Sequence, residues 1–229
     1  MATFKKSYVC GSTLIHSNWV ITSAHCVRGR LILENWQISF GDHIRHPKFD
    51  SVQGKSEITR KITKIKIHED FFMKANHSPR MDIALIKLDS PVDFTHSVNR
   101  ACLPSGEESS TKFCFAIGFG MTNWDAKEYP RSLMEAHMPK IPDSACRLKY
   151  GNEFVNSSMF CAGVLDGTRD TCVGDSGGPL ICKHRGGQWY LEGVISWGSE
   201  CGRKGWPSVY TRVTKFTQWI DDVIRKNTD

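Results

Sequence analysis

Short apolar segments bounded by turn residues are the feature that most constrains the fold of this chain. They recur along its length at residues 12–15, 19–22, 37–40, 58–67, 83–88, 113–117, 179–182, 190–196 and 209–212. Apolar runs of this length between turn residues are typical of β-strands. Residues 214–224 instead place apolar side chains at helical spacing after a threonine, and residues 143–150 predict a shorter helix. The sequence therefore predicts an antiparallel all-β protein with a C-terminal helix.

Length and composition favour a single folding domain. A chain of 229 residues that is 40% hydrophobic and 24% charged can bury a sizeable core. The sequence has no internal repeat, no low-complexity tract and no apolar run long enough to span a membrane. Its net charge of +6 is compatible with acidic partners, but no nucleic-acid-binding motif accompanies the charge, so we predict no nucleic acid partner.

The cysteines indicate an oxidising, extracellular location. Nine cysteines without any Cys-x-x-Cys pair argue against a zinc site and for the disulfide framework of a secreted protein. Asn76 and Asn156 each begin an Asn-x-Ser sequence, the acceptor pattern for N-glycosylation, which agrees with secretion. The carboxylates of Asp42 and Glu57 are too few to form a calcium site, and we predict neither a metal nor a cofactor.

A glycine-rich stretch around Ser176 carries the candidate chemistry. Residues 174–179 read Gly-Asp-Ser-Gly-Gly-Pro. The glycines allow a tight turn that aims the backbone amides of Gly174 and Ser176 at one point, as an oxyanion hole requires. A serine hydroxyl is a poor nucleophile at neutral pH, so acyl transfer also needs a base and a group that orients the base. His25 and Asp82 are the candidates for these two roles.

Each of these residues also has an ordinary interpretation. A single histidine is usually a surface or core side chain, Asp82 is compatible with the entry of a strand, and residues 174–178 are compatible with a turn. Taken singly, the ordinary interpretations are favoured. In combination, the residues predict a triad of His25, Asp82 and Ser176.

Further motifs extend this pattern in order along the chain. They are Cys10-Gly11, Asn18-Trp19-Val20, His25-Cys26, Asp82-Ile83-Ala84-Leu85, Gly118-Phe119-Gly120, Cys161-Ala162-Gly163, Ser196-Trp197-Gly198 and Pro207-Ser208-Val209-Tyr210. With them, the chain from about Tyr8 to its C-terminus resembles the trypsin-like serine endopeptidases of the chymotrypsin (S1) family. The resemblance implies a single domain over residues 1–229, made of two packed six-stranded antiparallel β-barrels with the active site between them. The first barrel is expected at about 8–104, the second at about 112–213, and the helix at about 214–225.

The resemblance also implies a role for each residue of the triad. His25 acts first as general base and then as general acid, Asp82 holds the tautomer of His25, and Ser176 attacks the substrate carbonyl. The backbone amides of Gly174 and Ser176 donate to the oxyanion. An acyl-enzyme forms on Ser176 and water then releases it.

Asp170 predicts the substrate preference. A carboxylate at the base of a narrow pocket is costly to desolvate unless a cation meets it, so Asp170 is expected to select arginine or lysine side chains. By resemblance, Ser196, Trp197 and Gly198 form one wall of this pocket. Ser208 stands where the family usually has glycine, and we expect its side chain to narrow the pocket floor and alter the preference between arginine and lysine.

The resemblance also assigns the cysteines. It implies the disulfides Cys10–Cys26, Cys114–Cys182, Cys146–Cys161 and Cys172–Cys201, which leaves Cys102 unpaired. In relatives with an upstream region, a cysteine at this place commonly bridges to the propeptide or the preceding domain. We therefore expect Cys102 to bridge to an upstream segment.

The start of the chain departs from the family pattern. Family members are activated when cleavage releases an Ile-Val-Gly-Gly-like N-terminus, whose amine pairs with the aspartate before the nucleophilic serine, here Asp175. The chain starts at Met1, nine residues before Cys10, without such a segment or a signal peptide. We therefore expect a secreted zymogen whose activation segment is missing here, and a chain that alone is weakly active or inactive.

The sequence thus favours a secreted serine endopeptidase that cleaves after arginine or lysine. Its expected partners are protein or peptide substrates, protein protease inhibitors, and the upstream domain or propeptide. The alternative is a noncatalytic protease-like binding module, because function depends on the site and not on the scaffold. The intact His25, Asp82, Ser176 and Asp170 argue against that alternative.

Overall fold

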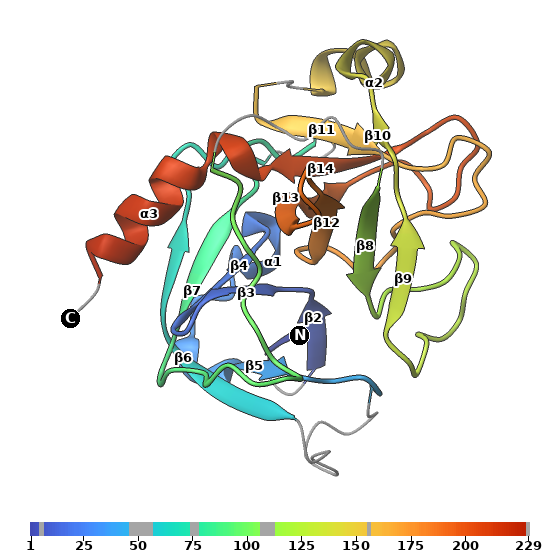
Figure 1. Ribbon diagram of the computed structural model, residues 1–229. Coiled ribbons are helices and arrows are strands. Elements are labelled where there is room, and N and C mark those ends of the chain that lie inside the picture. The colour runs from blue at the N-terminus through green and yellow to red at the C-terminus, as the bar shows by residue number, and fades with distance from the viewer. Residues whose placement is uncertain (5–6, 46–56, 74–77, 106–112, 155–156, 228–229) are drawn as a thin grey trace.

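Two curled antiparallel sheets, one above the other, make up most of the protein (Figure 1). The structure is a computed structural model, and it describes residues 1–4, 7–45, 57–73, 78–105, 113–154 and 157–227. The described part of the chain confirms the expected trypsin-like all-β fold.

The first sheet contains seven strands in the order β2-β1-β5-β6-β7-β4-β3. These strands are β1 (Ala2–Phe4), β2 (Ser7–Cys10), β3 (Thr13–His16), β4 (Trp19–Thr22), β5 (Trp36–Phe40), β6 (Ile58–Ile67) and β7 (Ala84–Leu88). The second sheet also contains seven, in the order β10-β11-β14-β13-β12-β8-β9. They are β8 (Cys114–Gly118), β9 (Met134–His137), β10 (Lys140–Ile141), β11 (Met159–Ala162), β12 (Pro179–Lys183), β13 (Trp189–Trp197) and β14 (Ser208–Arg212).

Each sheet contains one strand more than the six expected for each barrel. Two segments without a long apolar run, β1 and β2, form a hairpin at one edge of the first sheet. In the second sheet, the two-residue strand β10 pairs at an edge with β11. Strands this short are defined by their pairing partners, and their own sequence carries little signal.

Short helices lie in the connections between strands and after the last strand. They are α1 (Ala24–Val27), α2 (Asp143–Tyr150) and α3 (Thr217–Arg225), with short 3₁₀ turns at η1 (Leu33–Asn35), η2 (Gly151–Glu153) and η3 (Val213–Lys215). The helix expected from residue 214 is a 3₁₀ turn followed by α3, because the backbone of Phe216 departs from helical geometry at φ −118°. None of the helices in the described part of the chain has the length and apolar composition needed to cross a membrane.

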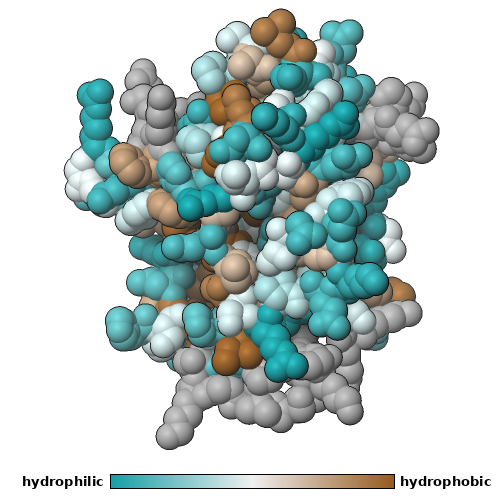
Figure 2. Space-filling view, turned by 90° about the vertical axis from the view of Figure 1, so that its right-hand side faces the viewer, coloured by the Kyte–Doolittle hydropathy of each residue, from teal (hydrophilic) through white to brown (hydrophobic). Residues whose placement is uncertain are grey.

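Two strands of the first sheet are buried on both faces. Along β4, Val20 points into the core of the first sheet, whereas Trp19 and Ile21 join a second core with Leu191 and Ile220. Leu191 lies on β13 and Ile220 on α3, so this second core joins the two halves of the molecule. This double burial explains why β4 and β7 are almost continuously apolar. In contrast, hydrophobic residues form only small groups on the hydrophilic face shown in Figure 2.

A fully buried carboxylate lies within the second sheet. Glu192 on β13 has no exposed surface. Its Oε2 atom lies 3.0 Å from Nζ of Lys140, and its Oε1 atom contacts Nε2 of His184. The side chains of Lys140 and His184 are 15% and 19% exposed. A buried carboxylate needs such partners because its desolvation is otherwise unfavourable.

We predict that Glu192→Ala lowers the free energy of unfolding by about 3 kcal/mol, because it removes the carboxylate that offsets the charge of the largely buried Lys140. Urea unfolding of the disulfide-intact protein measures this loss. The matched control is Glu200→Ala, at an exposed position, which should change stability by less than about 0.5 kcal/mol. Equal stability of the two variants would contradict the prediction.

Candidate active site

His25 and Asp82 meet in two hydrogen bonds. The backbone N–H of His25 donates to Oδ1 of Asp82 at 2.9 Å, and Nδ1 of His25 lies 2.7 Å from Oδ2. His25 is on the short helix α1 after β4, and Asp82 comes just before β7, which pairs with β4. The contact to a carboxylate places the imidazole proton on Nδ1 and leaves Nε2 free to accept a proton.

Asp82 is buried and held from both halves of the molecule. Its side chain accepts a hydrogen bond of 2.5 Å from Oγ of Ser196, and its backbone carbonyl accepts one of 2.8 Å from Oγ1 of Thr211. The preceding residue, Met81, has φ +49°, the only positive value at a non-glycine position in the described residues. Such backbone strain is found where the surroundings fix a functional side chain.

The surroundings of His25 favour its protonated form. Burial alone would lower the pKa of His25, but the charge of Asp82 and the hydrogen bond to it outweigh burial and raise that pKa above its ordinary value. Arg30 opposes this effect weakly. An imidazolium formed during a reaction would therefore be stabilised here.

Ser176 lies in a turn that is hydrogen-bonded to the first half of the molecule. Its carbonyl accepts a 2.8 Å hydrogen bond from the N–H of Gly11, and the N–H of Gly177 donates to Ile195 at 2.8 Å. A Cβ atom on Gly177 would lie 2.2 Å from Oγ1 of Thr22, so only glycine fits beside the residues that lead to His25. Within the described residues, no hydrogen bond joins the side chains of Ser176 and His25; catalytic contacts are often long without substrate.

The backbone amides of Gly174 and Ser176 are available to an external acceptor. No described residue accepts a hydrogen bond from either N–H group. Gly174 has φ +100°, and a Cβ atom there would lie 2.7 Å from Cε1 of Tyr129. Its carbonyl accepts a hydrogen bond from the hydroxyl of Tyr8. The N–H groups of Gly174 and Ser176, on either side of Asp175, can therefore form the predicted oxyanion hole.

Asp175 points away from these amides, into the second half. Its carboxylate accepts hydrogen bonds from the N–H groups of Gly120 at 2.8 Å and Cys172 at 3.0 Å. Burial raises the pKa of Asp175 despite these two bonds. The carboxylate borders a cavity of about 420 Å³, which also reaches Asp170. Cβ atoms on Gly118 and Gly120 would lie 2.0 and 2.3 Å from carboxylate atoms of Asp175, so side chains are excluded there.

Asp170 forms a hydrogen-bonded pair with Ser208. The hydroxyl of Ser208 donates to Oδ1 of Asp170 at 2.6 Å and accepts from Oγ1 of Thr171 at 3.0 Å. The N–H groups of Thr171 and Gly202 also donate to the carboxylate, each at 2.9 Å. Burial is the largest influence on Asp170 and raises its pKa, although these hydrogen bonds favour the charged form.

Ser208 faces the opposite wall of the expected pocket. A Cβ atom on Gly198 would lie 3.3 Å from Oγ of Ser208, so the two walls approach closely. The ring of Trp197 on the same wall packs edge-on against Tyr150 at 4.8 Å. The side chain of Ser196, which we expected at the substrate pocket, instead supports Asp82.

The structure contains all four predicted disulfides, Cys10–Cys26, Cys114–Cys182, Cys146–Cys161 and Cys172–Cys201. Cys102 is a free and exposed thiol. The predicted glycosylation acceptors Asn76 and Asn156 lie outside the described residues.

Two contributors to the site were not predicted from the sequence. Thr211 supports Asp82, and Tyr8 contacts Gly174 across 166 positions of the chain. Neither residue has a sequence signal of its own, because each acts through a contact that only the fold creates.

Known proteins resemble this chain over almost its whole length. Residues 1–220 match the family described as Trypsin. Transmembrane protease serine 11G of Mus musculus is 37% identical over 93% of this chain, which spans 49% of that relative's length. Cationic trypsin-3 of Rattus norvegicus is 37% identical over 96% of the chain and 81% of its own length. Trypsin of Sus scrofa is 34% identical over 96% and 87%, respectively. This chain therefore belongs to the trypsin family of serine proteases.

Proposed function

We propose that this domain is a serine endopeptidase that cleaves peptide bonds after arginine or lysine. The observation that carries the proposal is the contact of His25 with the buried Asp82 beside the Ser176 turn, where no described residue accepts a hydrogen bond from the amides of Gly174 and Ser176. His25 removes the proton of Ser176 as the hydroxyl attacks the carbonyl, and Asp82 stabilises the resulting imidazolium. The amides of Gly174 and Ser176 bind the oxyanion, and His25 then protonates the leaving amine.

Asp170 supports the preference for basic side chains. Its carboxylate is partly buried, and three neighbours donate hydrogen bonds to it. A substrate cation would offset the remaining cost of burying this charge. Because Ser208 occupies space beside Asp170, the smaller ammonium group of lysine fits more easily than the guanidinium group of arginine.

Asp175 supports activation by cleavage of a precursor. Its carboxylate borders the cavity of about 420 Å³, and no described cation pairs with it. In our proposal, the amine released by activation cleavage enters this cavity and pairs with Asp175. The new ion pair stabilises the turn that carries Gly174 and Ser176.

The proposed location is outside the cell. Four disulfides agree with an oxidising compartment. The relative from Mus musculus has the word transmembrane in its name, whereas the two trypsins do not, so the domain is compatible with both a released and a membrane-held protein. Protein protease inhibitors are further proposed partners, and the exposed Cys102 is the proposed attachment point of an upstream segment.

One observation keeps the alternative of a noncatalytic binding module open. The described residues include no hydrogen bond between His25 and Ser176. Covalent labelling discriminates the two functions, because a fluorophosphonate reacts only with an activated serine.

We predict that the activated full-length protein reacts with a fluorophosphonate and hydrolyses chromogenic peptides with arginine or lysine, but not phenylalanine, before the scissile bond. Ser176→Ala should abolish labelling and lower hydrolysis by at least about 10³-fold. The control Ser90→Ala, at an exposed position, should behave like the natural protein. Absence of labelling and hydrolysis in the natural protein would favour the binding module.

We predict that Ser208→Gly raises kcat/KM for arginine substrates by about 10-fold relative to lysine substrates, because it opens the pocket for the larger cation. Paired substrates that differ only in this residue measure the ratio. Asp170→Asn is the companion variant: it removes the charge and should lower kcat/KM for both substrates. An unchanged ratio in Ser208→Gly would show that Ser208 does not limit the pocket.

We predict that Cys102 holds the upstream segment to the activated enzyme. After activation cleavage, the full-length protein should migrate as one species without reductant and as two with it. Cys102→Ser should release the segment even without reductant. Comigration of the two parts in Cys102→Ser under these denaturing conditions would rule out this link.

A further inference from the structure

Gly174 needs outside contacts to hold one conformation. Glycine has the widest backbone freedom of any residue, and Gly174 lies at φ +100°. The peptide before it is fixed by the N–H of Met121, which donates to the carbonyl of Val173 at 2.9 Å. The peptide after it is fixed by the hydroxyl of Tyr8, which donates to the carbonyl of Gly174. The N–H of Gly174 therefore belongs to the first of these two anchored peptide groups, and the second holds the other side of its Cα.

The side chain of Tyr8 is itself held in place. Its ring packs edge-on against Tyr129, with 6.3 Å between ring centroids. The guanidinium carbon of Arg45 lies 5.5 Å from the ring centroid of Tyr8 and 4.4 Å from that of Tyr129. Such cation–π contacts restrain both rings. We call Tyr8, Arg45 and Tyr129 the tyrosine clamp.

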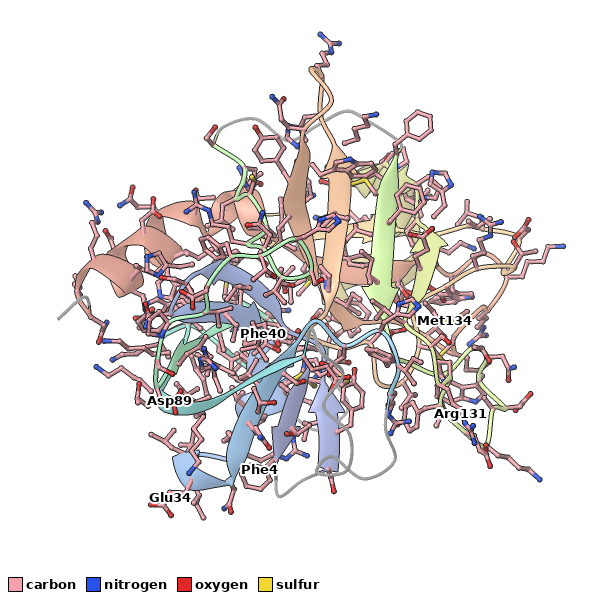
Figure 3. The ribbon with its side chains drawn as sticks, turned by 60° about the horizontal axis from the view of Figure 1, so that its bottom comes forward. Phe4, Glu34, Phe40, Asp89, Arg131 and Met134 are labelled. Atoms are coloured by element: carbon pink, nitrogen blue, oxygen red, sulfur yellow. A yellow bond between two sulfur atoms is a disulfide. The ribbon has the colours of Figure 1, made fainter. Side chains whose placement is uncertain are left out.

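The clamp joins the two halves of the molecule. Tyr8 is on β2, whereas Tyr129 precedes β9. The segment 43–45 pairs with 131–133 through an isolated bridge between Ile44 and Ser132 and a 2.6 Å hydrogen bond from the N–H of Arg45 to Arg131. Figure 3 labels Arg131, in the segment that pairs with 43–45, and Met134, the first residue of β9. Tyr129 also packs against Gly174, because a Cβ atom on Gly174 would lie only 2.7 Å from Cε1 of Tyr129.

We propose that Tyr8 is a positioning residue for the oxyanion hole: its hydroxyl, held by Arg45 and Tyr129, keeps the N–H of Gly174 aimed at the substrate oxyanion. This inference rests on the proposed protease function. Preorganised donors matter because they need not reorient while charge develops in the transition state. Tyr8 acts on that step through the backbone of Gly174 and does not touch the substrate.

The chemistry of the phenol suits this role. Burial raises the pKa of Tyr8, and the nearby Asp175 raises it further, while Arg45 opposes the effect. The hydroxyl therefore keeps its proton and remains a donor throughout the pH range in which a histidine base works.

The test compares Tyr8→Phe with Tyr190→Phe in the activated full-length protein; Tyr190 lies outside the tyrosine clamp, and its ring packs against His184. Each variant keeps its aromatic ring, but only Tyr8→Phe removes the donor to Gly174. We expect Tyr8→Phe to lower kcat about 10-fold with little change in KM, a smaller effect than the roughly 10²- to 10³-fold loss of an oxyanion donor itself. It should weaken binding of a peptide aldehyde, whose adduct places an oxyanion in the hole, by a similar factor. Tyr190→Phe should match the natural protein in both measurements.

A second measurement does not depend on activity. Hydrogen exchange of the backbone amides at 172–178, followed by mass spectrometry, should be faster in Tyr8→Phe than in Tyr190→Phe. Unchanged kcat, aldehyde affinity and exchange in Tyr8→Phe would overturn the proposal. A lower melting temperature with unchanged kcat would also overturn it, because it would show a packing role alone. Failure of the proposed function looks different, since the natural protein would then neither hydrolyse the peptides nor react with the fluorophosphonate.

Discussion

The buried carboxylate of Asp82 is the point at which the two halves of this protein depend on each other. Its side chain accepts hydrogen bonds from His25 in the first half and from Ser196 in the second. Its carbonyl accepts another from Thr211 on β14. A carboxylate with 2% exposure is unfavourable without such donors, so the sheets must meet in one arrangement to satisfy it. The hydrogen bonds to Asp82 therefore fix both the geometry of the site and the packing of the two sheets.

Much of the fold could be predicted because its longer elements carry their own signal. The predicted segments 19–22, 58–67 and 143–150 coincide with β4, β6 and α2. The strands β1, β2, β9, β10 and β11 were not predicted; each has four residues or fewer, and each is paired with neighbouring strands. The C-terminal helix was expected three residues too early, since the sequence does not distinguish a 3₁₀ turn from the first turn of an α-helix.

The candidate site was predictable where residue type alone implies chemistry. His25, Asp82 and Ser176 are unusual in combination, and the fold places the first two in direct contact. The contact between Tyr8 and Gly174 was not predictable, because a tyrosine near a strand end has many ordinary uses. The hydrogen bond from Ser208 to Asp170 was foreseen only as a narrower pocket. Sequence patterns identify reactive groups more readily than the contacts that orient them.

The double burial of β4 and β7 has a consequence for self-digestion by a domain with the proposed activity. Because these strands contribute to both cores, neither sheet can open without removing packing from the other. We therefore expect the two halves to unfold together. Under the proposed specificity, the lysine- and arginine-rich β6, which pairs with β7, is then protected from cleavage by a neighbouring copy of the domain until both halves unfold. In this proposal, resistance to self-digestion is a property of the shared core.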